Sequence, residues 1–170
     1  MVPFVERGER ILPFGGEERE ELGVTTMVRS LHSLAAWLLA ASVIVQAFLA
    51  GIAMLQLGGD GDFSTHIGVG YSVPGLLALI VLLTALVARL GRTQILLSGG
   101  LIVLYIIQTS LPLFAEGSPI IAALHPANAF LLFGAAIYVA RRQTRSAPAP
   151  TGVPAAPAAP ERPMSEGDES

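Results

Sequence analysis

The stretch LHPANAFLLFGAAIYVARR, residues 124–142, decides the fold that this sequence predicts. It forms the end of an apolar segment long enough to cross a bilayer, which requires about 20 such residues. His125 and Asn128 lie about one turn apart on the same face of the predicted helix. Because ionisable and amide groups are costly at membrane depth, an intramembrane histidine is from the start a functional-site hypothesis.

The composition is that of a membrane protein. Of the 170 residues, 52% are hydrophobic and only 14% are charged, whereas soluble domains carry about 25% charged residues. The chain contains no cysteine, which excludes disulfides, thiolate metal ligands and covalent c-type haem attachment. We find no soluble-enzyme motif, and the short arginine clusters do not indicate binding to nucleic acid.

Three further apolar segments precede the last one, so we predict an all-α integral membrane four-helix bundle. A polar segment at 1–26 precedes the transmembrane domain at 27–142, although Met27 is an alternative start. A Pro/Ala-rich tail at 143–170 is predicted to be disordered, because it lacks the apolar residues that repay ordering. The predicted spans cover about 31–55, 66–87, 94–111 and 119–140.

The arginines predict the orientation of the bundle. They precede span one, separate spans two and three, and follow span four. The other two short loops contain acidic residues and no basic residue. The positive-inside rule therefore places both termini in the cytoplasm and the acidic loops outside. We expect a multi-pass protein of the bacterial inner (plasma) membrane, in contact with the lipid bilayer.

Each predicted span brings one histidine or glutamine to the outer half of the bundle or near its middle. They are Gln46, His66, Gln108 and His125. His66 and His125 are expected at similar depths, because each lies a few residues below the outer end of its span. His32 lies at the opposite end of span one, where we interpret it as an interfacial residue without a role.

Two imidazoles from facing helices are suited to bind a haem iron axially. We therefore predict a cytochrome b-like site that holds haem b between spans two and four, for electron transfer or haem handling. Gly70 would let the porphyrin approach the backbone of the same helix face. Gln46, Gln108 and Asn128 would orient the imidazoles or bind the propionates. Pro74 and Pro126 leave the carbonyls four residues before them without helical partners.

Other functions stay open at this point. A non-enzymatic scaffold or accessory subunit would use the same histidines and glutamines as interhelical hydrogen bonds. A small transporter or proton pathway is a third hypothesis, but the spans lack the Asp or Glu that such a route commonly uses. A homodimer or a membrane partner protein would complete the assembly in any of these cases.

Two resemblances accompany these patterns. VQAFLAG (45–51), His66 with Gly70, YIIQ (105–108) and ALHPANAFLLFGAAIYVARR (123–142) resemble a family of small uncharacterised bacterial four-helix membrane proteins. The bundle is also similar to one four-helix half of haem A synthase, a resemblance that implies haem-facing roles for His66 and His125 and supporting roles for Gln46 and Gln108. The chain has only one such half, no outer cysteine pair and no glutamate just before His66, so the hydroxylation chemistry of that family is not implied.

Overall fold

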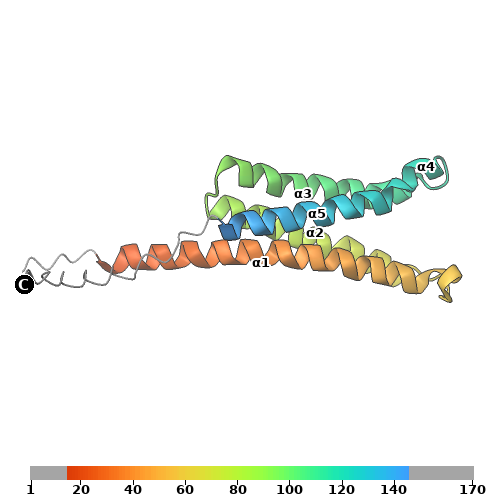
Figure 1. The fold of residues 1–170 in the computed structure, drawn as a ribbon, viewed down its shortest axis with the longest axis horizontal. Helices are drawn as coiled ribbons and strands as arrows, with labels where there is room; N and C mark the ends of the chain where they lie inside the picture. The colour runs from red at the N-terminus through yellow and green to blue at the C-terminus, as the bar shows by residue number, and fades with distance from the viewer. Residues whose placement is uncertain (1–14, 146–170) are drawn as a thin grey trace, which may run out of the picture.

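The computed structural model describes residues 15–145, and this part of the chain is helical with no strand (Figure 1). Four helices are long and apolar enough to cross a membrane, the fourth being interrupted once. The prediction of an all-helical four-helix protein is confirmed at this level. The elements are α1 (Gly15–Ala53), η1 (Leu55–Leu57), α2 (Ser64–Val87), α3 (Arg92–Ser110), η2 (Leu111–Phe114), α4 (Pro119–Ala122) and α5 (Leu124–Arg145).

The long helices form a four-membered ring in cross-section. α1 packs against α2 and α5, and α3 packs against the same two helices. α1 is thus diagonally opposite α3, and α2 is diagonally opposite α5. In Figure 1 the α1/α2 pair and the α3/α5 pair separate toward the end that carries η1 and α4. We call this the histidine end, and the opposite end, which carries the arginines, the basic end.

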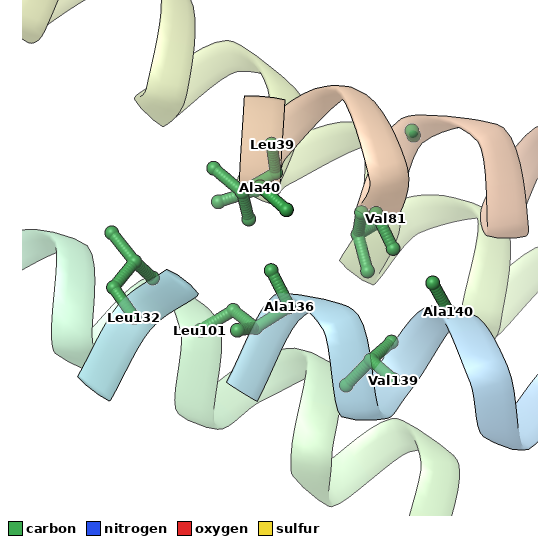
Figure 2. Close-up of a cluster of buried hydrophobic side chains, with 11 residues drawn as sticks. Leu39, Ala40, Val81, Leu101, Leu132, Ala136, Val139 and Ala140 are labelled. Carbon is green, nitrogen blue, oxygen red and sulfur yellow. The ribbon is translucent and has the colours of Figure 1, made fainter. Parts of the chain in front are cut away.

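The core lies toward the basic end and is built largely from small side chains. Ala36, Ala136 and Ala140 are completely buried, and Leu39 and Leu101 belong to the same cluster of buried side chains. Figure 2 shows part of this cluster. Small residues let the backbones of membrane helices approach closely, and van der Waals packing then stabilises the bundle. Large apolar side chains such as Phe48 and Phe130 remain exposed on the outside, which fits a surface covered by lipid.

The fourth predicted span is two helices and not one. α4 ends at Ala122 and α5 begins at Leu124. The physical reason is Pro126, which has no N–H to donate to the carbonyl of Ala122 and whose ring excludes a continuous helical turn there. His125 consequently lies in the first turn of α5, not six residues along an unbroken helix.

α1 is longer than the span predicted within it. Its 39 residues extend ~58 Å at about 1.5 Å per residue, roughly twice the thickness of the hydrocarbon layer. Residues 15–26, predicted to lie in a separate polar segment, are therefore part of the same helix. The predicted disordered tail begins at residue 143, but residues 143–145 are the last of α5. Residues 1–14 and the rest of the predicted tail, from residue 146 onward, lie outside the described residues.

The acidic loop before α2 is held by its own side chains. Asp62 accepts hydrogen bonds from the backbone N–H (2.8 Å) and the hydroxyl (3.0 Å) of Ser64, the first residue of α2. Asp60 in turn accepts a bond from the N–H of Asp62 at 2.9 Å. The bonds from Ser64 favour the ionised carboxylate, so they hold the pKa of Asp62 below its usual value.

Candidate functional site

His66 of α2 and His125 of α5 meet at the histidine end. Their ring centroids are 6.2 Å apart and the ring planes are inclined by 69°. Both side chains are half-buried, and they come from helices that are diagonally opposite in the bundle. The structure thus brings together the two residues on which the haem hypothesis depends, while their role as ligands stays a prediction.

Each of these imidazoles is anchored by a backbone carbonyl of the preceding long helix. His66 Nδ1 lies 3.1 Å from the carbonyl oxygen of Gln46, and His125 Nδ1 lies 2.9 Å from that of Gln108. A carbonyl oxygen only accepts, so these two contacts favour the tautomer in which Nδ1 carries the proton and Nε2 keeps its lone pair. Metal-binding histidines are commonly oriented in this way by a bond at the other ring nitrogen.

The carboxamide of Gln108 covers the ring of His125. Its nitrogen lies 3.1 Å from Nδ1 and 3.0 Å from Nε2. An atom almost equidistant from both ring nitrogens sits over the ring, not on the in-plane lone pair of either. Asn128 fixes the other end of the amide by donating to Gln108 Oε1 (2.7 Å), and it also donates to the carbonyl of Leu104 (3.0 Å).

Gln46 makes a different contact, with the backbone of α2. In the orientation that satisfies both of its polar atoms, its amide nitrogen lies 2.9 Å from the carbonyl oxygen of His66 and 3.1 Å from His66 Nδ1, and its oxygen accepts from the N–H of Gly70 (3.2 Å). A Cβ on Gly70 would lie 2.9 Å from the Gln46 side chain. The space that Gly70 provides is therefore used by Gln46, an alternative to the predicted close approach of a porphyrin.

A cavity of about 500 Å³ lies between the α1/α2 pair and the α3/α5 pair, and we call it the slot. Binding pockets for small molecules commonly have volumes of about 300–1,000 Å³. His66 lines one wall of the slot and His125 the other, and most of the remaining lining is aliphatic or aromatic. The side chains that line it include no Asp, Glu, Lys or Arg.

The two flanks of the slot are seams between neighbouring helices. By helical phase, Ile44 and Ala47 of α1 face Phe130 of α5 across one seam. Ile67 and Tyr71 of α2 face Thr109 and Leu113 across the other. Tyr105 spans this second seam, because its hydroxyl donates to the carbonyl of Tyr71 at 2.7 Å. Its ring packs so closely on Gly75 that a Cβ there would lie 2.6 Å from it.

The two walls of the slot are built from corresponding residues. Gln46 and Gln108 are 62 positions apart, and His66 and His125 are 59 positions apart. In each pair the glutamine carbonyl accepts from the histidine of the following long helix. The hairpins α1–α2 and α3–α5 therefore present the same arrangement to the slot from opposite sides. A glutamine followed by a histidine recurs in the sequence, 20 residues later in the first hairpin and 17 residues later in the second, and this recurrence could have predicted the pairing.

The prediction that His32 is an interfacial residue without a role is wrong. It is completely buried at the basic end. Its Nδ1 contacts the carbonyl of Val81 (3.0 Å) and the hydroxyl of Thr84 (3.2 Å). Gln94 donates both to His32 Nε2 (3.0 Å) and to the carbonyl of Val139 (3.1 Å). This network joins all four long helices, and sequence reasoning missed it because the partners are 45 to 62 residues apart.

The donor set limits which metal the described residues could hold. No group of three or more His, Asp or Glu side chains gathers anywhere between residues 15 and 145. A structural zinc site needs four ligands, which two imidazoles do not supply. His66 and His125 alone suit a metal whose other positions are filled by a macrocycle.

Comparison with known proteins gives one match. Residues 46–114 match a family of unknown function (DUF6220). The matched segment runs from Gln46 through α2 and α3 and includes His66 and Gln108, but it ends before His125. No curated protein and no solved structure matches the chain significantly.

Proposed function

We propose that this chain is an integral membrane protein that holds haem b in the slot, with His66 and His125 as the axial ligands. The observation that carries the proposal is the pair of imidazoles on opposite walls, each with Nδ1 bound to a backbone carbonyl. These contacts favour the tautomer in which Nε2 keeps the lone pair that a metal needs.

The separation of the rings supports this assignment. A metal bound between the rings would make two bonds to imidazole nitrogens, each of about 2 Å. Adding the distance from each bound nitrogen to the centroid of its ring gives about the observed 6.2 Å between centroids. The 69° inclination is compatible as well, because two imidazoles on opposite faces of a macrocycle can twist independently. The slot between them is the space in which a flat ligand would lie.

The remaining polar residues of the site would act on the histidines. Asn128 holds the Gln108 amide over the ring of His125, and Gln46 ties α1 to the backbone of α2 at Gly70. These contacts would limit rotation of the imidazoles and so keep the ligand set in place. If His66 and His125 both hold haem b, the group would supply one-electron transfer.

Orientation and location belong to the same proposal. Arg29, Arg89, Arg92 and Arg141 are all on the basic end. Trp37 contacts Arg141 there through its ring, 6.0 Å from the guanidinium carbon to the ring centroid. By the positive-inside rule this end would face the cytoplasm, and the slot would lie in the outer half of a bacterial plasma membrane.

A second candidate function is a membrane scaffold or accessory subunit. The observation that favours it is the set of bonds among Gln108, Asn128 and His125, which link α3 to α5 directly. Such bonds stabilise membrane helix pairs by about 0.6 kcal/mol on average. A homodimer or a partner protein would fit either function, and the resemblance to one half of haem A synthase remains a hypothesis.

The deciding experiment is a reduced-minus-oxidised absorption spectrum of the full chain, purified from haem-supplemented cells. We expect a low-spin b-type spectrum that is lost in His66→Ala and in His125→Ala. His66→Met is expected to retain haem with a raised potential, because a thioether axial ligand has that effect. His32→Gln is the matched control, since it changes the third histidine at the basic end and should leave the spectrum intact. A folded parent without colour would favour the scaffold.

A further inference from the structure

The two seams that flank the slot are equivalent in position but not in closure. Tyr105 and Val43 are 62 positions apart, the same offset that relates Gln108 to Gln46, and both line the slot. The Tyr105 hydroxyl bridges α3 to the backbone of α2. Val43 has no polar atom in its side chain and cannot make the equivalent bridge from α1 to α5.

The seam between α1 and α5 therefore lacks the bridge that Tyr105 forms at the other seam. The hydroxyl of Ser33 joins these helices by donating to the carbonyl of Ala140, but this bond lies far away at the basic end. At the slot, Ile44 and Phe130 flank this seam and are 60% and 77% exposed. In a membrane these side chains would contact lipid. Ile67, Tyr71 and Leu113 at the other seam are also exposed, so the absence of a bridge like that of Tyr105, and not exposure, distinguishes the α1/α5 seam.

An aromatic side chain packs against His66 at the loop end of the site. Phe63, the residue just before α2, packs edge-on against His66 with ring centroids 6.2 Å apart. The lining of the slot is almost entirely apolar and carries no charged side chain. Transfer of an apolar ligand from lipid into such a lining avoids exposing its surface to water on the way.

We propose that the ligand reaches the slot sideways from the lipid, through the seam between α1 and α5, with Phe130 at its mouth. The ligand class is a flat apolar molecule dissolved in the bilayer. Its identification as a tetrapyrrole rests on the function proposed above, but the route itself does not. The two can therefore be tested separately.

The route can be tested without haem, because the chain has no cysteine. Ala129→Cys places a single thiol in the lining of the slot. In liposomes we expect a long-chain N-alkyl maleimide to label this thiol faster than a charged, water-soluble maleimide does. Faster labelling by the charged reagent would mean that the slot opens to water, and would overturn the proposal.

Matched substitutions at the two seams identify the entrance. Ala47→Trp fills the α1/α5 seam, and Thr109→Trp fills the equivalent position at the α2/α3 seam, 62 residues away. In the Ala129→Cys background, Ala47→Trp should slow labelling by the alkyl reagent about tenfold, while Thr109→Trp should leave it unchanged. Ala47→Phe is the milder variant if the tryptophan impairs folding. Slowing by Thr109→Trp alone would place the entrance at the other seam and overturn the assignment.

A haem experiment then connects the route to the proposed function. Loading of the apoprotein from haem-containing liposomes should be slower in Ala47→Trp than in the parent. Tyr105→Phe, which removes the bridge across the α2/α3 seam, should accelerate loading. A parent that never acquires a haem spectrum would overturn the function, while the maleimide rates would still decide the route.

Discussion

The two ends of the bundle contain the same kinds of polar residue in opposite surroundings. At the basic end His32 and Gln94 are bonded to each other and almost completely buried. At the histidine end His66 and His125 line a cavity of about 500 Å³. A histidine within a membrane helix therefore does not by itself indicate a ligand site. What matters is whether the neighbouring helices close around it.

The difference in closure follows from the side chains beside each cluster. Near His32 the facing positions are small, as at Ala36 and Ala140, so the backbones come together and the polar groups find partners. At the other end the bulkier Phe133 and Pro126 line the slot. Side chains of this size do not allow the helix backbones to approach as closely as alanines do.

The largest expected effect distinguishes the two ends directly. His32→Ala should lower the free energy of unfolding by about 2–4 kcal/mol, because it leaves a cavity and removes partners from buried polar groups. His66→Ala should cost less than about 1 kcal/mol, since its ring borders an existing cavity. Denaturation of both variants in the same detergent measures the difference. Equal losses of unfolding free energy in the two variants would contradict the difference in closure between the basic end and the histidine end.

The next prediction compares the two seams at the histidine end. Gly75→Ala should destabilise the protein by about 1–3 kcal/mol, because the new Cβ would lie 2.6 Å from the ring of Tyr105. Gly134, 59 positions later, has no neighbouring atom within 4 Å of such a Cβ. Gly134→Ala should therefore be neutral or stabilise by up to ~1 kcal/mol. Thermal midpoints of the two variants provide the test, and a reversed order would contradict the closed α2/α3 seam.

A smaller effect is expected from the amide that covers His125. Gln108→Leu should lower stability by about 0.6 kcal/mol, the average value of an interhelical bond in membranes, because Asn128 still donates to the carbonyl of Leu104. If haem binds, the same variant should weaken its binding by loosening His125. Stability and haem affinity are measured on one preparation. A loss as large as that of His32→Ala would show that the histidine end is as tightly bonded as the basic end.

The smallest effect concerns the loop that leads into α2. The lowered pKa of Asp62 in the folded chain contributes stability above its usual pKa, which is lost as the pH falls through the folded-state value. Asp62→Asn should therefore flatten the dependence of the thermal midpoint on pH in the acidic range, with little change at neutral pH. Ser64→Ala, which removes one of the two bonds to the carboxylate, should flatten it partly. An unaltered pH profile in both variants would contradict this role.

Much of the fold was predictable, because its signals are local in the sequence. The apolar runs and the loops between them indicate α2 and α3 almost to their ends. The break before α5 was missed, although Pro126 is its cause, because proline is tolerated within many membrane helices. The extension of α1 to Gly15 was missed because a polar segment can continue a helix outside the membrane without any apolar pattern.

The candidate site was predictable only as a set of residues at similar depth. That His66 and His125 lie near the same end follows from counting along their helices. Their anchoring by the carbonyls of Gln46 and Gln108 does not, because it depends on the rotation of each helix about its axis. Gly70 illustrates the same point, since the group that needs its missing side chain is Gln46 of another helix.

By itself, the sequence determined that this chain has four apolar helices, with arginines at one end and two histidines near the other. Hydrophobic length and the placement of charge are properties of each segment and need no neighbour. Only the tertiary structure decided that His32 is enclosed and bonded while His66 and His125 face a cavity. That outcome depends on how closely the helices approach at each level, and their separation is set by the side chains that meet between them.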